Sequence, residues 1–204
     1  MPSEVLREVL SADYRGPRAV FSEVHVLKAI MAVGKAGSVG RGRLGSLLDL
    51  GQGEVRTLIR RLSEKGLIAV KADGCTLTAK GMREFQRLED EMPWSAAVPG
   101  KALMIGDECW AVLVRGAKDQ VRLGIEQRDA AVRAGANGAF TAVFTSGVFR
   151  TPGEGRDSEK DGPKALWSAV RAAGPVEGDV VVVSGADDER AAEGGALAAA
   201  LTLV

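Results

Sequence analysis

Apolar residues recur at helical spacing through the first third of the chain. In residues 54–65, one face of a 3.6-residue helical period holds Val55, Leu58, Ile59 and Leu62. Leu44, Leu47 and Leu48 predict a shorter helix over 43–48 with all three leucines inward. A longer helix is predicted after Ser22, which can cap it. The helices over 43–48 and 54–65 are separated by Leu50-Gly51-Gln52-Gly53. Gly51 permits a positive φ at the end of the first helix, and Gln52 and Gly53 leave the N-terminal tip of the second open to a phosphate.

The pattern changes to an extended one after Gly66. Residues 67–71 and 75–77 predict two short strands joined by a turn at 72–74, and Thr78 caps a closing helix with Met82, Phe85 and Leu88. The first fifteen residues also carry helical spacing. That segment is an arm or dimer contact or, in the favoured interpretation, a short helix covering the edge of the first domain.

The second half is rich in Gly, Ala and Val and follows a predicted linker over 92–100. Strands are predicted at 109–114, 138–145, 148–150 and 179–184, and helices at 127–134, 164–173 and 188–201. Residues 101–105 are expected to pair with the first of these strands, and 151–162 to form a charged loop. The expected architecture is α+β, a two-layer sandwich of an antiparallel or mixed sheet with helices on one face.

Length and composition fit this division. A chain of 204 residues, of which 46% are hydrophobic, has room for two domains with buried cores. We predict an N-terminal helix or arm at 1–19, a domain at 20–91, a linker at 92–100 and a second domain at 101–204. No apolar run approaches the roughly 20 residues that cross a bilayer, and the polar N-terminus lacks a signal-peptide pattern. A cytoplasmic location without membrane contact is therefore expected.

Positive charge is concentrated on the predicted helix pair. The net charge is zero, but residues 35–71 hold 8 Lys and Arg against 3 Asp and Glu, which gives +5. The face of 54–65 opposite its apolar stripe is basic, and such a face suits the major groove of DNA. The candidate DNA-binding residues are Arg41, Arg43, Gln52, Arg56, Thr57, Arg60, Arg61, Lys65 and Lys71.

Other candidate chemistry is sparse. Cys75 and Cys109 with the single His25 are too few ligands for a structural zinc site, and the glycine-containing loop at 34–42 lacks the GK[ST] ending of a P-loop. The acidic run at 187–189 is interpreted as the start of a helix, where acidic side chains interact favourably with the helix dipole, and not as a metal site. Arg128 and Asp129 are candidates for a ligand pocket, although surface charges or a salt bridge are the favoured interpretation. Neither an enzyme nor a cofactor is indicated.

Two resemblances follow from these residues. The stretch SVGRGRLGSLLDLGQGEVRTLIRRLSEKGLI followed by LTAKG resembles the winged helix-turn-helix family, in which a three-helix core and a β-hairpin wing bind DNA. The whole chain resembles an archaeal family whose second domain is similar to the GAD domain of bacterial-type aspartyl-tRNA synthetases. That likeness is carried by QRDAAVRAGANGA at 127–139, EGDVV at 177–181 and the Ala191, Glu193, Gly194 and Ala196 pattern. It implies architecture more firmly than activity.

The sequence thus predicts a DNA-binding transcriptional regulator whose 20–91 domain binds double-stranded DNA. The 101–204 domain is expected to form a homodimer, to sense a small-molecule effector, or both. Two alternatives stay open: an RNA- or tRNA-associated protein, and a winged helix used as a protein-interaction module.

Overall fold

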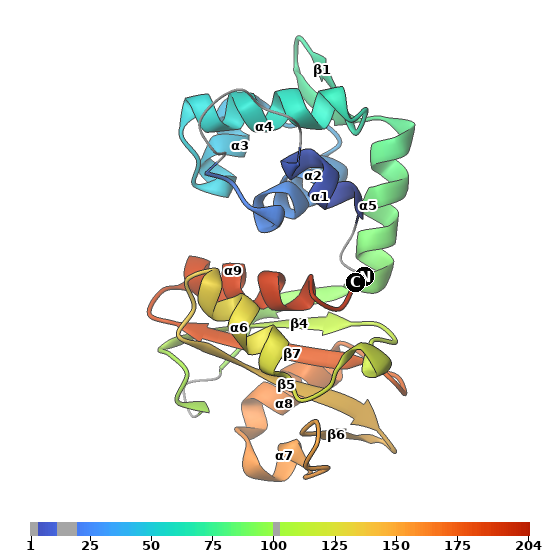
Figure 1. Ribbon diagram of the computed structural model, residues 1–204, viewed down its shortest axis with the longest axis vertical. Helices are drawn as coiled ribbons and strands as arrows, with labels where there is room; N and C mark the ends of the chain where they lie inside the picture. The colour runs from blue at the N-terminus through green and yellow to red at the C-terminus, as the bar shows by residue number, and fades with distance from the viewer. Residues whose placement is uncertain (1–3, 12–19, 100–102) are drawn as a thin grey trace. The chain divides into compact units, whose positions relative to one another are not determined.

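The computed structural model describes residues 4–11, 20–99 and 103–204, and the chain divides into two compact units that meet between Leu88 and Glu89 (Figure 1). The first unit is mainly helical with one hairpin, and the second is built on a sheet. The predicted α+β class is confirmed. Residues 1–3 and 12–19 of the predicted N-terminal part lie outside the described residues.

The first unit packs its helices around the apolar positions that the helical spacing marks. Its elements are α1 (Glu4–Leu10), α2 (Glu23–Ala36), α3 (Arg41–Leu48), α4 (Gln52–Glu64), the antiparallel hairpin β1 (Ile68–Lys71) and β2 (Gly74–Leu77), and α5 (Ala79–Glu91). Val55, Leu58, Ile59 and Leu62 are all buried. Leu47 was expected inward but is 47% exposed, because only Leu44 and Leu48 of the short α3 face the core.

The second unit contains a five-stranded sheet in which every neighbouring pair is antiparallel, with the order β3-β4-β7-β5-β6. Its elements are β3 (Trp94–Ala97), β4 (Glu108–Val114), the 3-10 helix η2 (Lys118–Gln120), α6 (Ile125–Arg133), β5 (Gly138–Thr145), β6 (Val148–Arg150), α7 (Ser158–Asp161), α8 (Lys164–Ala172), β7 (Val180–Ala186) and α9 (Glu189–Ala200).

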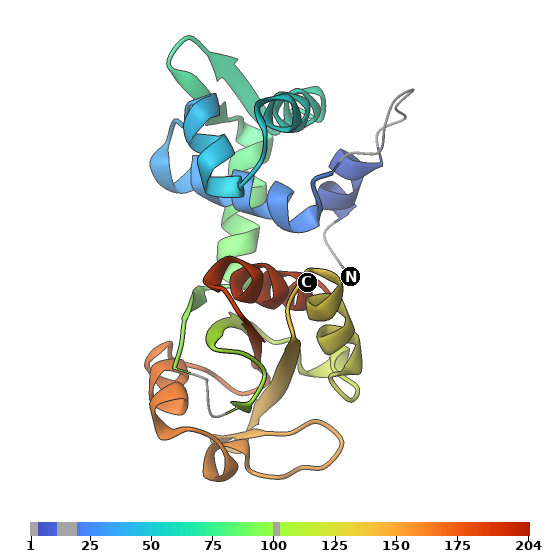
Figure 2. The same cartoon turned by 90° about the vertical axis from the view of Figure 1, so that its left-hand side faces the viewer.

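Helices cover both faces of this sheet, as Figures 1 and 2 show. Val181 and Val183 of β7 join a core with Leu166 and Trp167 of α8. The alternate residue Ser184 faces the other way, toward Gly195 of α9. The expectation of a two-layer sandwich with helices on one face was therefore wrong. All seven residues of β7 are buried, as a strand covered on both faces requires.

The predicted linker at 92–100 contains an edge strand. Trp94–Ala97 forms β3 and pairs with β4 from Trp94 opposite Leu113 to Ala97 opposite Trp110. The pairing expected for residues 101–105 was wrong for its described part, because Leu103 lies in a 3-10 turn and 104–105 in bends; residues 101–102 are outside the described residues. Among the helices that the structure describes, none has both the length and the apolar character needed to span a bilayer.

Candidate nucleic-acid interface

A tight connection joins α3 to α4. The left-handed residue that ends α3 is Asp49, at φ 54°, whereas Gly51 has an ordinary φ of −63° and serves as the N-cap of α4. The Gly51 N–H donates to Glu54 Oε2 at 2.8 Å. One expectation is corrected here, because the positive φ lies at Asp49 and not at Gly51. At the tip of α4, the Gly51 N–H already binds a carboxylate, whereas the predicted phosphate approach at Gln52 and Gly53 stays a prediction.

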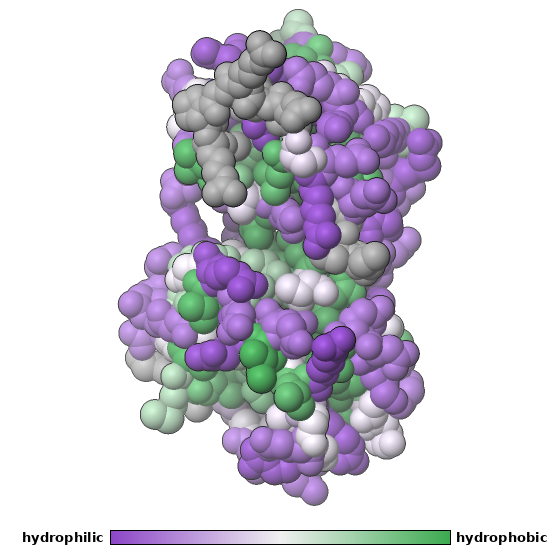
Figure 3. Space-filling view, in the orientation of Figure 1, coloured by the Kyte–Doolittle hydropathy of each residue, from purple (hydrophilic) through white to green (hydrophobic). Residues whose placement is uncertain are grey.

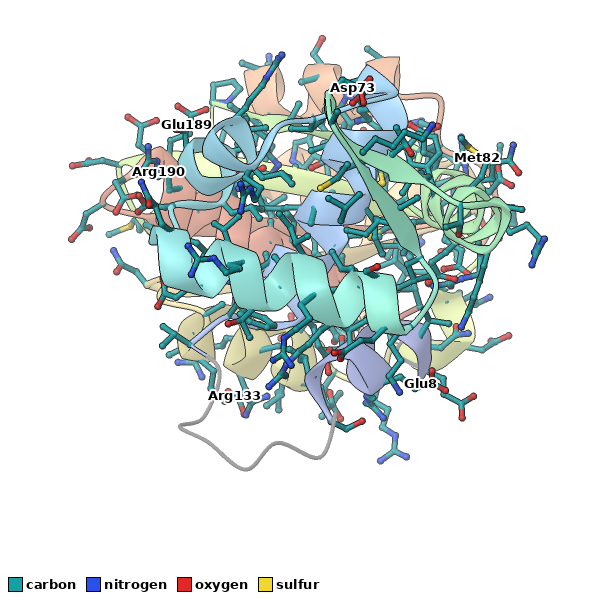
Figure 4. All side chains as sticks on the ribbon, turned by 90° about the horizontal axis from the view of Figure 1, so that it is seen from above. Glu8, Asp73, Met82, Arg133, Glu189 and Arg190 are labelled. Carbon is teal, nitrogen blue, oxygen red and sulfur yellow. The ribbon has the colours of Figure 1, made fainter. Side chains whose placement is uncertain are left out.

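A groove of about 570 Å³ lies between α4 and the hairpin. Arg41, Arg56 and Arg60 line it from the helices, and Lys71 lines it from β1. Two carboxylates, Glu64 and Asp73, also line this hairpin groove. Figure 4 shows the hairpin, with Asp73 at its turn, on the same side of the unit as α4. The groove is therefore rich in cations that can donate to anionic oxygen atoms.

A second groove, of about 860 Å³, lies between α3 and α4. Gln52, Ser46 and Asp49 line it, together with Arg41 and Arg56, which also line the hairpin groove. These two arginines therefore stand between the grooves, where they can reach a ligand that extends across both.

The nine predicted DNA-binding residues separate into groups. The structure brings four of them together in the hairpin groove, namely Arg41, Arg56, Arg60 and Lys71. Arg43 is exposed but lines neither groove. Thr57 is half-buried and donates to Gly53 O at 3.0 Å within its own helix. Lys65 is half-buried at the end of α4.

Arg61 does not face outward, contrary to expectation. It is only 3% exposed and donates from Nη1 to Val9 O at 3.2 Å and Leu10 O at 3.0 Å. Its guanidinium also lies 5.3 Å from the centre of the Phe21 ring. Arg61 therefore binds the last carbonyls of α1. The helical period of residues 54–65 could not reveal this, because α1 is distant in sequence.

Two residues near these grooves have structural roles. Burial raises the pKa of the Cys75 thiol, although Arg41 opposes the shift, and a protonated thiol is a poor nucleophile. His25 occupies the third position of α2, where its Nδ1 accepts from Ser22 N at 3.0 Å. The sequence reasoning missed this cap, although the Ser-x-x-His spacing matches that of a capping box.

The candidate residues of the second unit form local contacts. Arg128 Nη1 lies 3.5 Å from Asp129 Oδ1, and both side chains are largely exposed. Asp188 caps α9 by accepting from Ala191 N at 2.9 Å, and Asp187 accepts from Asn137 Nδ2 at 2.8 Å. Within residues 4–11, 20–99 and 103–204, no three His, Cys, Asp or Glu side chains cluster as a metal site would require.

The structure thus defines a two-unit α+β protein with a cation-lined groove in its first unit. Residues 105–203 match a family described as Domain of unknown function (DUF4443). The fold is similar to that of the hypothetical protein PH0730 from the archaeon Pyrococcus horikoshii OT3, with a TM-score of 0.69 and 25% sequence identity over 90% of this chain and 92% of that one. No curated protein matches the chain.

Proposed function

We propose that residues 20–91 form a winged helix-turn-helix and that the protein is a sequence-specific DNA-binding transcriptional regulator. The observation that carries this proposal is the hairpin groove, where two helices, α3 and α4, and one hairpin place Arg41, Arg56, Arg60 and Lys71 around a single depression. Cations in this arrangement can neutralise several phosphates of one duplex, and they favour binding at low salt.

Duplex DNA fits the surface around α4 better than duplex RNA does. The 13-residue helix α4 presents Arg56 and Arg60 on its outer side. The major groove of B-DNA admits an α-helix, whereas the deep and narrow major groove of A-form RNA does not. We assign Arg56 and Arg60 to base edges or adjacent phosphates and Lys71 to the backbone. Arg61 is removed from this set because it binds α1.

We assign a dimerisation or ligand-sensing role to the second unit. Its antiparallel sheet and helices support a GAD-like architecture in a general way, with the added layer of α8 as a difference. The exposed Arg128–Asp129 pair offers no enclosed pocket by itself, so we place no effector there.

Fluorescence anisotropy with Arg56→Ala and Arg60→Ala tests the proposed function. On a site enriched from genomic DNA, we expect each variant to lose about tenfold or more in affinity when the arginine contacts a base. An arginine that contacts a phosphate lowers the salt slope by about one when removed. Arg83→Ala is the matched control, because this exposed arginine of α5 lies in the same unit and lines neither groove.

The Arg83→Ala control distinguishes binding at the groove from general electrostatic attraction to DNA. If Arg83→Ala weakens binding as much as Arg60→Ala, the groove is not the binding surface. If both groove variants keep the affinity and salt slope of the unmodified protein, the assignment of α4 is wrong. Competition by tRNA at a lower concentration than duplex DNA would favour the RNA-associated alternative.

A further inference from the structure

Helix α6 exposes its two largest apolar residues and buries a glutamine. The residues that it buries against the rest of the second unit are Gln127, Ala130 and Ala131. Its larger apolar residues point to solvent, with Ile125 at 53% exposure and Val132 at 43%. A helix on the surface of a globular unit ordinarily directs such residues inward.

The inward side of α6 also carries a buried polar side chain whose hydrogen bonding is incomplete. Gln127 is 2% exposed and donates from Nε2 to Thr202 Oγ1 at 2.7 Å, but within the described residues its Oε1 has no hydrogen-bond partner. Leu123, just before the helix, is 61% exposed and extends the outer apolar surface. Figure 3 shows hydrophobic surface over α6 between hydrophilic side chains. The exposed apolar surface formed by Leu123, Ile125 and Val132 favours a partner on the outer side of α6.

The charges on the outer side specify what that partner is. At about 100° per residue, Ile125 and Val132 lie within about 20° of each other and define the midline of the exposed stripe. Arg128 falls about 50° to one side of this midline, and Asp129 falls about 50° to the other. Glu126 and Arg133 lie farther round on the Asp129 side, at about 100° from the midline, where their charges offset each other. The stripe is therefore apolar along its centre, basic on the Arg128 flank and acidic beside it on the Asp129 flank.

We propose that α6 pairs with α6 of a second copy of this chain. When two such helices run parallel about a two-fold axis along the helix direction, Ile125 meets Ile125 and Val132 meets Val132 of the second copy. The Arg128 flank of each copy then meets the Asp129 flank of the other. An antiparallel pair would instead place like charges on the same flank. The charges therefore select the parallel arrangement.

The size of α6 determines how this dimer behaves. A stable interface covers about 800 Å² on each partner, which is more than a helix of nine residues provides. We therefore expect a reversible dimer with α6 at its centre, whose fraction rises with protein concentration. This inference does not depend on DNA binding, because every measurement below uses the full chain without DNA.

Charge reversal with analytical ultracentrifugation tests the pairing. The unmodified protein should form a concentration-dependent dimer, whereas Arg128→Asp and Asp129→Arg should each be monomeric because one flank then repels its counterpart. The double variant Arg128→Asp/Asp129→Arg exchanges the two flanks and should restore the dimer. A monomeric unmodified protein at all attainable concentrations overturns the proposal, as does a dimer that both single variants retain.

Disulfide capture tests the direction of the helices. Cys75 and Cys109 are both buried, so an added surface cysteine is the accessible thiol. Under mild oxidation with diamide, Ile125→Cys alone should form a covalent dimer when the helices are parallel. Cross-linking that instead requires a mixture of Ile125→Cys and Val132→Cys proteins would overturn the parallel arrangement. Val132→Gln should remain folded by circular dichroism and lose the dimer; a full dimer in this variant would also overturn the proposal.

Discussion

Arg60 and Arg61 are adjacent in sequence but have different surroundings. Arg60 is 42% exposed in its side chain and pairs with Glu64 at 3.5 Å, whereas Arg61 is buried against the end of α1. One step along the helix turns the side chain by about 100°, which moves it from the hairpin groove to the contact with α1. Two arginines that look equivalent in sequence therefore differ in role: Arg61 stabilises the first unit, and Arg60 is the one that the proposed DNA contact uses.

Arg61→Ala should lower the free energy of unfolding by about 2 kcal/mol, because two hydrogen bonds from a charged donor to the carbonyls of Val9 and Leu10 are lost. Urea unfolding monitored by circular dichroism measures this change. Arg60→Ala is the control, and its exposed ion pair should contribute no more than about 0.5 kcal/mol. Equal destabilisation by the two substitutions would show that the buried contact of Arg61 with α1 stabilises the protein no more than the exposed ion pair of Arg60 does.

His25 should make the stability of the first unit depend on pH. Burial and, to a smaller extent, Lys28 lower its pKa, against weaker opposing effects of Glu54 and Asp49. The unfolded chain therefore binds a proton more readily than the folded chain. The stabilisation is complete above the ordinary pKa of 6.5 and is lost as pH falls from there toward the lowered value. Protonation of Nδ1 would also remove the acceptor for Ser22 N.

His25→Gln is the matched comparison for this pH effect, since glutamine at the third helical position can also bind the N-cap N–H but does not titrate. The difference in free energy of unfolding between the unmodified protein and this variant should be constant above pH 6.5. Below pH 6.5 the unmodified protein should lose stability relative to the variant. Urea titrations across this range measure the difference. A difference that stays constant down to pH 5 would rule out the titration of His25 as the cause.

At the scale of elements, hydrophobic spacing correctly predicted helices and strands that depend on residues close together in the sequence. The strand at 138–145 matches β5, and the apolar stripe of 54–65 is the buried side of α4. Sequence could not show that α8 covers the second face of the sheet, because this depends on long-range packing. The same limit applies to the site: four of nine candidate residues meet in the hairpin groove, but the burial of Arg61 depends on α1.

The close approach of α5 to the backbone of Leu67, just before β1, requires Gly81. A Cβ atom there would lie 2.0 Å from Leu67 O, a backbone atom that cannot move without disturbing the hairpin. Gly81→Ala should therefore destabilise the protein by about 2 kcal/mol or more despite the higher helix propensity of alanine. Gly42→Ala in α3 is the control, because a Cβ there meets nothing within 4 Å, and it should gain up to about 1 kcal/mol. Thermal unfolding of the two variants should give shifts of opposite sign.

At the scale of the whole molecule, charge is divided between the halves of the chain. Residues 1–92 hold 15 Lys and Arg against 12 Asp and Glu, which gives +3, and residues 93–204 hold 12 against 15, which gives −3. A chain with zero net charge can therefore still present a basic surface. Because exposed charges are screened beyond about 10 Å at 0.1 M salt, the acidic half should oppose the proposed DNA binding mainly at low ionic strength.

The boundary of the second unit also belongs to this scale. Its compact fold begins at Glu89, before the 101–204 domain predicted from sequence and before the family match at 105–203. A fragment of residues 101–204 would lack β3 and with it Trp94 and Val98, which pack on the core. It would also expose the edge of β4, which invites aggregation.

We therefore expect the 89–204 fragment to be more stable than the 101–204 fragment by at least about 3 kcal/mol, since large core side chains and one strand pairing are lost from the shorter one. Urea unfolding compares the two fragments, and light scattering checks whether the shorter one aggregates. The variant Trp94→Ala in the longer fragment separates the contribution of the side chain from that of the strand. Equal stability of the two fragments would mean that β3 is dispensable and that the unit begins near residue 101.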